Sequence, residues 1–314
     1  MKQTITFSPK LDYISENIIY LLSLNSRLSI TDLATILKIN RKIIENRTKR
    51  LYEHGFIKPL LIFNHKKILK ATILIKLSRF DEETLFSIKK MNTFVKVKET
   101  LGEYDLSLLT MTSNKTDFEE ILEKINIQFH DIIINMDVVF HELEDTLGYK
   151  SFCHDLKLIE RYHLLSFNNE YELTKEETGV LEMIKVKPNI KYNQLMAETG
   201  KNYQAIKKII NGMAEKQIIR FTVDPDYEKL GLQFHNILVK INLANRNLFE
   251  KNILVHPRIH WIKRSTGAWD YIISVASRDI KEFIEITRDI RTKNKSSILN
   301  FTTLISYIHL PRKV

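Results

Sequence analysis

Residues 27–57, RLSITDLATILKINRKIIENRTKRLYEHGFI, contain two short apolar-periodic segments that are separated by a tight break. Ser29 together with Asp32 is typical of a capping box at the start of the first segment. Asn40 is a favourable N-cap for the second segment, and Gly55 can end that helix in the left-handed conformation. The stretch therefore predicts two helices that are joined by a turn.

The segments on either side of this stretch complete a small module. A preceding helix has an apolar stripe at Ile18, Ile19, Leu21 and Leu22. Downstream, FIKPLLIF (residues 56–63) is rich in residues that favour strands, and it predicts the two strands of a small wing hairpin. Three helices followed by such a hairpin form a winged helix-turn-helix.

The last helix of this module has an apolar back and a cationic front. Ile44, Thr48 and Leu51 share one face by their i, i+4, i+7 spacing. A cationic front fits the DNA major groove, where cations neutralise phosphates and Arg reads guanine. An isolated basic helix is more often simply solvated, and it is the helix-turn-helix context that favours DNA. The predicted contacts to double-stranded DNA are Arg41, Lys42, Arg47, Lys49 and Arg50.

The chain contains an internal repeat. Residues 11–57 align without gaps with residues 173–219, and their apolar positions coincide. Residues 99–121 align in the same way with residues 264–286. Each half therefore has the same two modules in the same order, which indicates a tandem duplication.

The second module of each half predicts the element order βαββαβ. It begins with an alternating strand, ATILIKL or NILVKINL, and contains a hairpin around the turn GEYD or GAWD. This order gives a ferredoxin-like antiparallel sheet with both helices on one face, and the second copy can cover the other face. The predicted class is α+β. The predicted domains are winged helix-turn-helix domains at 1–60 and 173–222, ferredoxin-like domains at 61–148 and 223–314, and a connector at 149–172.

The second helix-turn-helix is degenerate. Four positions differ in kind from the first copy, where Arg47, Lys49, Arg50 and Gly55 correspond to Ile209, Asn211, Gly212 and Gln217. Its remaining cations, Lys201, Lys207 and Lys208, can bind phosphate better than they can discriminate bases. Tyr203 and Gln204 are further candidate DNA contacts of this module. Sequence reading is therefore expected mainly from the first copy. There, Arg47 lies beside the apolar face, so bracing against a phosphate or an acidic neighbour is an alternative role for it.

Three motifs together resemble the Lrp/AsnC (leucine-responsive, feast-famine) transcription regulators over nearly the whole chain. They are RTKRLYEHGFI (47–57), VDPDYEKLGL (223–232) and a twice-occurring Gly-x-aromatic-Asp turn, at Gly102, Tyr104, Asp105 and at Gly267, Trp269, Asp270. The resemblance implies ligand-sensing (RAM) domains that dimerise sheet to sheet and can bind an amino acid near those six turn residues. One chain would then form the pair of sensing domains that an ordinary dimer forms, and larger homo-oligomers can build on it.

The Gly-x-aromatic-Asp turn also has a purely structural interpretation. Gly supplies a positive φ, the aromatic residue packs across the strands, and Asp bonds the backbone of its own turn. An amino-acid ligand would need an anion for its ammonium group and backbone N–H donors for its carboxylate, which such a turn can offer. The sequence leaves both alternatives open.

Composition agrees with a DNA-binding protein of the cytoplasm. Among 314 residues, 48 Lys and Arg face 38 Asp and Glu, so the net charge is +10 and the partner is expected to be polyanionic. The single Cys153 excludes an intrachain disulfide. We expect neither a secretory leader nor a membrane span, because charged residues interrupt every apolar run.

Signals for catalysis are weak, and we expect neither enzymatic activity nor a bound cofactor or metal. HELED (141–145) lacks the second His of a zinc-protease helix, and Cys153, His154 and His163 have poor chelate geometry. One enzymatic alternative remains, because siroheme decarboxylases resemble the same two-module family. Their His-Asn-Tyr-x-Arg type motif has only a partial counterpart here, at His260, Lys263 and Arg264.

Overall fold

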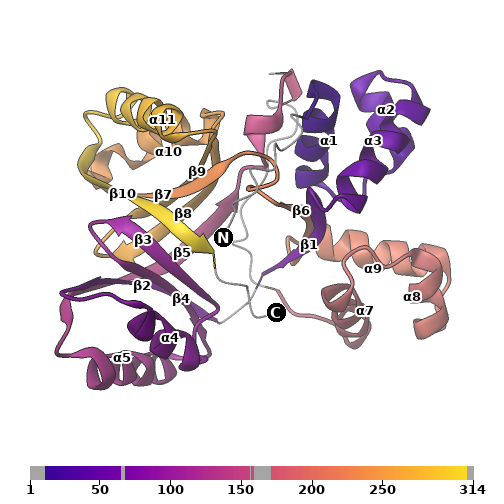
Figure 1. The fold of residues 1–314 in the computed structure, drawn as a ribbon. Helices are drawn as coiled ribbons and strands as arrows, with labels where there is room; N and C mark the ends of the chain where they lie inside the picture. The colour runs from indigo at the N-terminus through magenta and orange to yellow at the C-terminus, as the bar shows by residue number, and fades with distance from the viewer. Residues whose placement is uncertain (1–10, 65–67, 156, 159–170, 310–314) are drawn as a thin grey trace, which may run out of the picture. The chain divides into compact units, whose positions relative to one another are not determined.

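The computed structural model describes residues 11–64, 68–155, 157–158 and 171–309. The chain divides into two compact units, and each unit takes one segment from each half of the sequence. The first unit comprises Met1–Lys66 and Thr146–Gln233, and the second comprises Lys67–Asp145 and Phe234–Val314. The fold is mixed α+β, as predicted (Figure 1).

In the first unit, the N-terminal half forms the predicted three helices. These are α1 (Tyr13–Leu24), α2 (Ile30–Leu37) and α3 (Arg41–Glu53). The capping box of Ser29 and Asp32 is confirmed, and the Asn40 side chain caps α3. The buried faces of the three helices meet in one apolar core, which includes Ile18, Leu22, Leu33, Ile44 and Leu51.

The second half contributes a matching set of helices to the same unit. These are α7 (Lys175–Val186), α8 (Tyr192–Thr199) and α9 (Tyr203–Glu215). Thr174 and Glu177 form a capping box at the start of α7, and Asn202 caps α9. Their core is separate from the first and includes Val180, Leu181, Leu195, Ile206 and Ile210.

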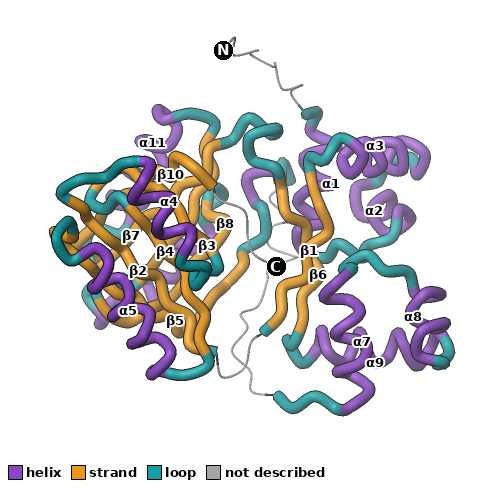
Figure 2. The backbone as a smooth tube through the Cα atoms, turned by 60° about the horizontal axis from the view of Figure 1, so that its bottom comes forward, coloured by secondary structure: helices purple, strands orange, loops and turns teal. Residues whose placement is uncertain are grey.

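The predicted wing hairpin is wrong. FIKPLLIF has no Gly, Asn or Asp at which the chain could turn back, and β1 (Ile57–Phe63) runs as one continuous strand. Its antiparallel partner is β6 (Ile219–Pro225), with Ile57 opposite Pro225 and Phe63 opposite Ile219 (Figure 2). The two helix-turn-helix modules thus share a two-stranded ribbon to which each contributes one strand.

The segment predicted as a connector begins inside the core of the first unit. A short 3-10 helix, η1 (Lys150–Phe152), follows the last strand of the first half. Tyr149 and Phe152 are buried in the same cluster as Ile18 and Leu22. Residues 159–170 of this segment, including His163, lie outside the described residues.

The second unit contains the βαββαβ order twice. The first set is β2 (Leu69–Leu77), α4 (Glu82–Lys90), β3 (Lys96–Gly102), β4 (Leu106–Thr112), α5 (Lys115–Phe129) and β5 (Ile133–Thr146). The second set is β7 (Gln233–Ile241), α10 (Arg246–Val255), β8 (Ile259–Gly267), β9 (Tyr271–Ser277), α11 (Ile280–Lys293) and β10 (Ile298–His309), with a 3-10 turn, η2 (Leu243–Asn245), before α10.

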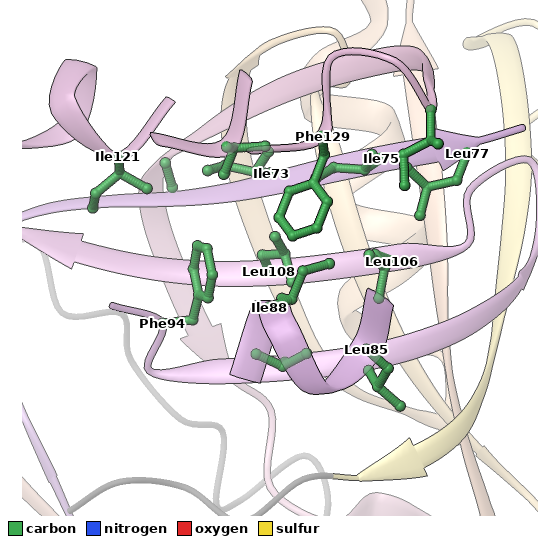
Figure 3. Packing of buried hydrophobic residues seen from close by; sticks show 14 of the residues in the cluster. Ile73, Ile75, Leu77, Leu85, Ile88, Phe94, Leu106, Leu108, Ile121 and Phe129 are labelled. Atoms are coloured by element: carbon green, nitrogen blue, oxygen red, sulfur yellow. The ribbon is translucent and has the colours of Figure 1, made fainter. Parts of the chain in front are cut away.

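The strands of both sets close into one barrel with the order β10-β3-β4-β2-β5-β8-β9-β7. The sequence predicted two sheets that face each other, and the structure adds hydrogen-bonded pairing at their edges. On one side β10 pairs with both β7 and β3, so it bridges the two sets. Helices α4 and α5 cover the outside of the first set, where Leu85, Ile88, Ile121 and Phe129 pack against Ile73, Ile75, Leu106 and Leu108 (Figure 3).

Within the described part of the chain, no helix has the length and apolar character needed to cross a membrane.

Candidate functional sites

Helix α3 presents the candidate DNA contacts of the first module. Ile44, Thr48 and Leu51 are buried on its inner face, as their spacing predicts. On the outer side, Lys42 lies 3.6 Å from Glu45, and Lys49 lies 3.7 Å from Glu53. Exposed pairs of this kind contribute little to stability, so these lysines are available to a polyanion. The exposed cations of this surface are Arg41, Lys42, Lys49 and Arg50.

Two further residues of α3 were missed by the sequence analysis. Ile43 is 43% exposed, so its aliphatic side chain lies on the solvent side of the helix beside the cations. Asn46 is also exposed, and both residues line a shallow depression on α3 together with Arg50. An aliphatic side chain can contact the thymine methyl group, and Asn can bond adenine in the major groove. Helical periodicity places Ile43 and Asn46 on the same side as Arg50, so the sequence contained the signal for both residues.

Arg47 is engaged within the protein. Its guanidinium lies 2.7 Å from the Asp12 carboxylate, which also caps α1 through the Ser15 N–H. Partial burial acts to raise the pKa of Asp12, but the Ser15 hydrogen bonds and the charges of Arg47 and Arg50 hold it below its usual value. The contact matches the alternative role of bracing against an acidic neighbour. A DNA contact from Arg47 stays a prediction.

Helix α9 of the second module presents a different surface. Gln204, Lys207 and Lys208 are exposed, whereas Lys201 lies 2.5 Å from the Glu176 carboxylate. Tyr203 is 43% exposed and its ring lies 5.0 Å from that of Tyr192. The Gly212 position has open space where a Cβ would be, so packing does not require glycine there. This helix offers lysines and amide and phenol groups, but no arginine.

One arginine joins the two helix-turn-helix modules. Arg27 follows α1 and donates from Nη2 to the carbonyl oxygens of Pro188 and Ile190, at 3.2 and 3.1 Å. Its guanidinium lies over the rings of Phe221 and Tyr192, at 4.4 and 5.3 Å from their centroids. Burial lowers the pKa of Arg27. Because all of these partners are far away in the sequence, no local pattern could have indicated this role.

The aspartates of the two Gly-x-aromatic-Asp turns are held by neighbouring strands. Asp105 accepts hydrogen bonds from the Leu77 N–H at 2.8 Å and from Lys76 Nζ at 2.9 Å. Asp270 accepts from the Ile241 N–H at 2.8 Å, and Lys240 Nζ lies 3.3 Å from it. The prediction that each Asp bonds the backbone of its own turn is therefore wrong. Each aspartate instead ties its hairpin to the strand beside it.

The aromatic residues of the two turns meet inside the barrel. Tyr104 and Trp269 are 1% and 3% exposed, and the indole N–H of Trp269 donates to Tyr104 Oη at 3.0 Å. Tyr104 in turn donates to the Asp137 carboxylate at 2.5 Å. Burial and this carboxylate raise the pKa of Tyr104 well above its usual value.

The glycines of the two turns allow close approach of the two strand sets. Gly102 has φ +130°, and a Cβ there would lie 2.6 Å from the Thr303 carbonyl oxygen. Gly267 has φ +122°, and its Cβ would lie 2.3 Å from the Val138 carbonyl oxygen. Each turn therefore lies against a strand of the other half. The glycines and aromatic residues of the turns join the two strand sets, whereas each aspartate holds its hairpin within its own set. An effector contact from the six residues stays a prediction.

The second unit contains a pocket, partly open to solvent, that the sequence analysis did not predict. Its volume is about 270 Å³, and its lining combines polar side chains, apolar side chains and three lysines. The described lining residues are Thr72, Leu74, Val95, Lys96, Lys98, Ser107, Leu109, Phe234, Asn236, Leu238, Trp261, Lys263, Ile272, Ser274 and Leu304. Alternation of Lys with apolar residues in FVKVKETL was visible in the sequence, but not which face of that strand would line the pocket.

The partial counterpart of the siroheme decarboxylase motif is not brought together. Trp261 and Lys263 of β8 line the pocket, whereas the neighbouring Arg264 projects from the opposite side of the strand. There Arg264 makes two hydrogen bonds to Glu250, at 2.9 and 2.5 Å, and Tyr271 donates to the same carboxylate. His260 is fully buried.

The weak metal signals do not converge either. HELED lies in strand β5, so its His and Glu lack helical spacing. His154 pairs with Glu16, and burial raises the pKa of the Cys153 thiol to about 11. Among the described residues, no group of three His, Cys, Asp or Glu side chains is placed to hold a metal ion.

Comparison with known proteins gives both a sequence relationship and a fold relationship. No family model matches the chain. The HTH-type transcriptional regulator FL11 of Pyrococcus furiosus is 26% identical over 121 residues, which are 37% of this chain and 80% of that protein. The crystal structure of the siroheme decarboxylase NirDL has a TM-score of 0.58 at 11% identity, and the match covers 95% of this chain and 92% of that one. At that identity, the likeness shows the fold alone.

A second sequence relative is closer over its aligned region. The HTH-type transcriptional regulator Ptr1 of Methanocaldococcus jannaschii is 34% identical over 101 residues, which are 30% of this chain and 68% of that protein. Its description as an HTH-type regulator agrees with the helix-turn-helix elements described above. The chain therefore belongs to the Lrp/AsnC family of HTH-type transcriptional regulators.

Proposed function

We propose that this protein is a sequence-specific DNA-binding transcription regulator of the cytoplasm that reads its site mainly through α3. The observation that carries the proposal is the outer surface of α3. Its cations surround Ile43 and Asn46, and a buried apolar back fixes the helix in its module. This arrangement offers phosphate contacts and base contacts on the same helix. The two sequence relatives are both described as HTH-type transcriptional regulators, which supports the same role.

We further propose that the chain is a tandem duplication and acts as an intrachain pseudo-dimer. Support comes from the way each unit is assembled from both halves of the chain. The two helix-turn-helix modules share one ribbon, and the two βαββαβ modules share one barrel. A single polypeptide then presents two DNA-binding modules and two sensing domains. Larger homo-oligomers can be built from this intrachain unit.

The two DNA-binding modules are proposed to have unequal tasks. Helix α3 has arginines, and one guanidinium can donate two hydrogen bonds to a guanine. The exposed cations of α9 are Lys207 and Lys208. Lysines act as point charges that suit phosphate better than a base edge. The preferred DNA site is therefore expected to be asymmetric, with the stronger half-site under α3.

Selection of bound fragments from random duplex DNA tests this proposal. Enrichment of one asymmetric motif, with affinity that falls steeply as salt rises, is the expected result. The slope of log K against log[salt] should be about −0.9 for each phosphate contacted. Binding that is independent of ionic strength, or a selection that enriches no motif, would contradict a sequence-specific regulator.

Siroheme decarboxylation is a second candidate function, and it rests on the fold match over almost the whole of both chains. The separation of Lys263 from Arg264 on opposite faces of β8 argues against it. The test is to mix the purified protein with siroheme and to measure carbon dioxide release and the absorption spectrum. Turnover would replace the regulator as the main function, and its absence would leave the regulator alone.

A further inference from the structure

The two reading helices belong to modules that share one two-stranded ribbon. Strands β1 and β6 pair over their whole lengths and connect the bundle α1–α3 with the bundle α7–α9. A ribbon of two strands twists more variably than a larger sheet and is barely stable by itself. The orientation of α9 relative to α3 therefore depends on side-chain contacts between the bundles and the ribbon.

Strand β6 is fixed to the first module, although it belongs to the second half of the chain. The Thr222 hydroxyl donates to the Ser23 carbonyl oxygen at 2.8 Å. The Ser26 N–H donates to the Phe221 carbonyl oxygen at 3.2 Å, and Val223 is buried in the core of the first module. Strand β6 also contributes to the core of α7–α9. Apolar packing is non-directional, so it leaves the orientation of that bundle to polar and aromatic contacts.

Arg27 supplies directional contacts at this junction. It lies in the loop between α1 and α2, and the carbonyl oxygens that it binds, of Pro188 and Ile190, lie in the corresponding loop between α7 and α8. Its guanidinium also lies over the rings of Phe221 in β6 and Tyr192 in α8. A planar guanidinium with donors in a rigid fork, facing two rings, accepts a narrow range of orientations. One side chain thus ties the first module to a loop, a strand and a helix of the second half.

From Tyr192, the contacts continue to the reading helix of the second module. The rings of Tyr192 and Tyr203 lie 5.0 Å apart and are tilted by 58°. Tyr203 is the first residue of α9, and the ammonium of Lys207, one turn later, lies 5.9 Å from the centroid of its ring. Aromatic pairs and cation–ring contacts both depend on direction. The series Arg27, Tyr192, Tyr203 and Lys207 therefore leads from the first module to a candidate phosphate contact on α9.

We infer that Arg27 is a positioning residue that fixes the orientation of α9 relative to α3 through Tyr192 and Tyr203. The phosphates that α9 reaches depend on this orientation, so Arg27 also determines where the second module touches DNA. This second part rests on the proposed function, whereas the orientation is measurable without DNA. Arg27 itself needs no contact with DNA for this role.

Spin-label distances in the full chain without DNA test the orientation. Cys153→Ser removes the single native thiol, and Lys42→Cys with Lys208→Cys places one label on α3 and one on α9. Double electron–electron resonance should give a narrow distance distribution when Arg27 is present. Arg27→Met keeps an apolar stem but no hydrogen-bond donor, so the distribution should become broader or be displaced. An unchanged distribution in Arg27→Met would overturn the inference.

Two controls separate orientation from folding. Labels at Glu182→Cys of α7 and Lys208→Cys of α9 lie within one module, so Arg27→Met should leave their distribution unchanged. A change there would assign Arg27 to the folding of that module and overturn the positioning role. Arg288→Met, at an exposed arginine of α11, makes the same charge change in the other unit. It should leave the distance between α3 and α9 unchanged, and equal broadening by this variant would also overturn the inference.

Arg27→Lys is the second variant if Arg27→Met does not fold. Lysine keeps the charge and the apolar stem but lacks the planar fork that faces both rings and both carbonyl oxygens. The distribution between α3 and α9 should again become broader or be displaced. A lysine variant with the wild-type distribution would show that the guanidinium does not set the orientation, and would overturn the inference.

Phosphate interference on the selected DNA site tests the consequence for binding. Ethylation of single phosphates shows which of them each module needs. In the wild type, the phosphates needed by α9 should form one discrete group, about one helical turn (roughly 34 Å) from those needed by α3. In Arg27→Met the α3 group should remain, while the α9 group is lost or spreads over more positions. Equal weakening of both groups would indicate a structural role and overturn the placement of α9 on DNA by Arg27.

The two measurements distinguish failure of the inference from failure of the proposed function. If the protein bound no DNA, the regulator would fail, and the spin-label distances would still decide the role of Arg27. If it bound the selected DNA but the distances were the same with and without Arg27, the regulator would stand and the inference would fail.

Discussion

The indole N–H of Trp269 donates to the phenolic oxygen of Tyr104 across 3.0 Å, and these residues come from corresponding turns of the two halves. The Tyr104 hydroxyl in turn donates a hydrogen bond to the Asp137 carboxylate. Because both rings are buried in one cluster with Leu74 and Leu238, this contact joins the two strand sets of the barrel. The indole N–H and the phenolic oxygen are paired inside an apolar cluster, so removing one group leaves the other without this hydrogen bond.

Tyr104→Phe should lower the free energy of unfolding by about 1–3 kcal/mol, because it leaves the buried Trp269 indole N–H without its acceptor, while the partly exposed Asp137 carboxylate keeps its hydrogen bond from Asn135. Trp269→Ala should cost about 3–5 kcal/mol, since it also opens a cavity. Urea denaturation followed by circular dichroism measures both changes. Tyr13→Phe, at a side chain that is 61% exposed, is the matched control and should change stability little. A Tyr104→Phe variant as stable as that control would show that the buried pair contributes nothing.

Two glycine substitutions should act in opposite directions. Gly267→Ala places a Cβ against the Val138 carbonyl at a φ of +122°, and should destabilise the protein by more than the roughly 1–3 kcal/mol of the backbone strain alone. Gly212→Ala has open space within helix α9, and should stabilise by about 1 kcal/mol. Thermal unfolding of the two variants beside the wild type provides the comparison. The interpretation of the turns fails if Gly267→Ala is neutral.

The Asp12–Arg47 pair should make stability depend on pH. The folded-state pKa of Asp12 is lowered, so its contribution is present above the unfolded-state pKa of about 3.9 and is lost as pH falls through the folded value. Asp12→Asn keeps an N-cap side chain but loses the charge, and should cost about 0.2–1 kcal/mol at neutral pH. Urea titrations at several pH values should show that this difference begins to shrink near pH 4 and disappears only below the lowered folded-state pKa of Asp12. Arg47→Met should give the same pattern, and a difference that persists in acid would exclude the ion pair as its cause.

Paired lysine substitutions test the division of labour between α3 and α9. Lys42→Ala with Lys49→Ala should abolish specific binding, whereas Lys207→Ala with Lys208→Ala should weaken binding to every sequence and flatten the salt dependence by about two phosphate contacts. Footprints of both double variants on one selected site give the comparison. Lys115→Ala with Lys124→Ala, on the outside of α5, controls for the loss of charge. Equal loss of base preference in both variants, on a palindromic site, would contradict the division.

Asn46 offers a narrower test of base reading. If its amide bonds a base edge, Asn46→Ala should cost about 1–3 kcal/mol on the selected site and relax specificity at one base pair. Binding to unrelated DNA should stay almost unchanged, because the phosphate contacts remain. Competition titrations against a set of single-base variants of the site measure this directly. Uniform weakening across the whole set would indicate a structural role for Asn46.

The sequence allowed prediction of the helix-turn-helix because its determinants are local. Ser29 and Asp32, Asn40 and the spacing of Ile44, Thr48 and Leu51 lie within a few turns of each other. The βαββαβ order followed from alternation along each strand in the same way. Strand β1 was assigned to the wrong partner because its hydrogen bonds go to residues 219–225, and a strand sequence does not encode which distant edge it meets.

The candidate sites divide along the same line. The cations of α3 were predictable from helical periodicity, whereas the pocket required knowledge of how the barrel closes. Lys96 and Lys98 alternate with valines along β3, so the lysines lie on one face of the strand. That this face lines the pocket depends on how β3 and β10 pair in the barrel. The engagement of Asp105 by Leu77 was likewise hidden, because it depends on a strand that is 28 residues away.

Under the proposed tandem duplication, the Arg27 contact bears on how freely each half can change. In a dimer of identical chains, each interface contact occurs twice, and any substitution changes both copies at once. Here Arg27 meets Pro188 and Ile190 once, and the position that aligns with Arg27 in the second half is Asn189. Covalent linkage also keeps the partners at a high local concentration, so dilution cannot separate them. Neither half has to fit a copy of itself, so each can change its own surface independently. This independence would allow α3 to specialise in reading bases while α9 contacts only phosphates.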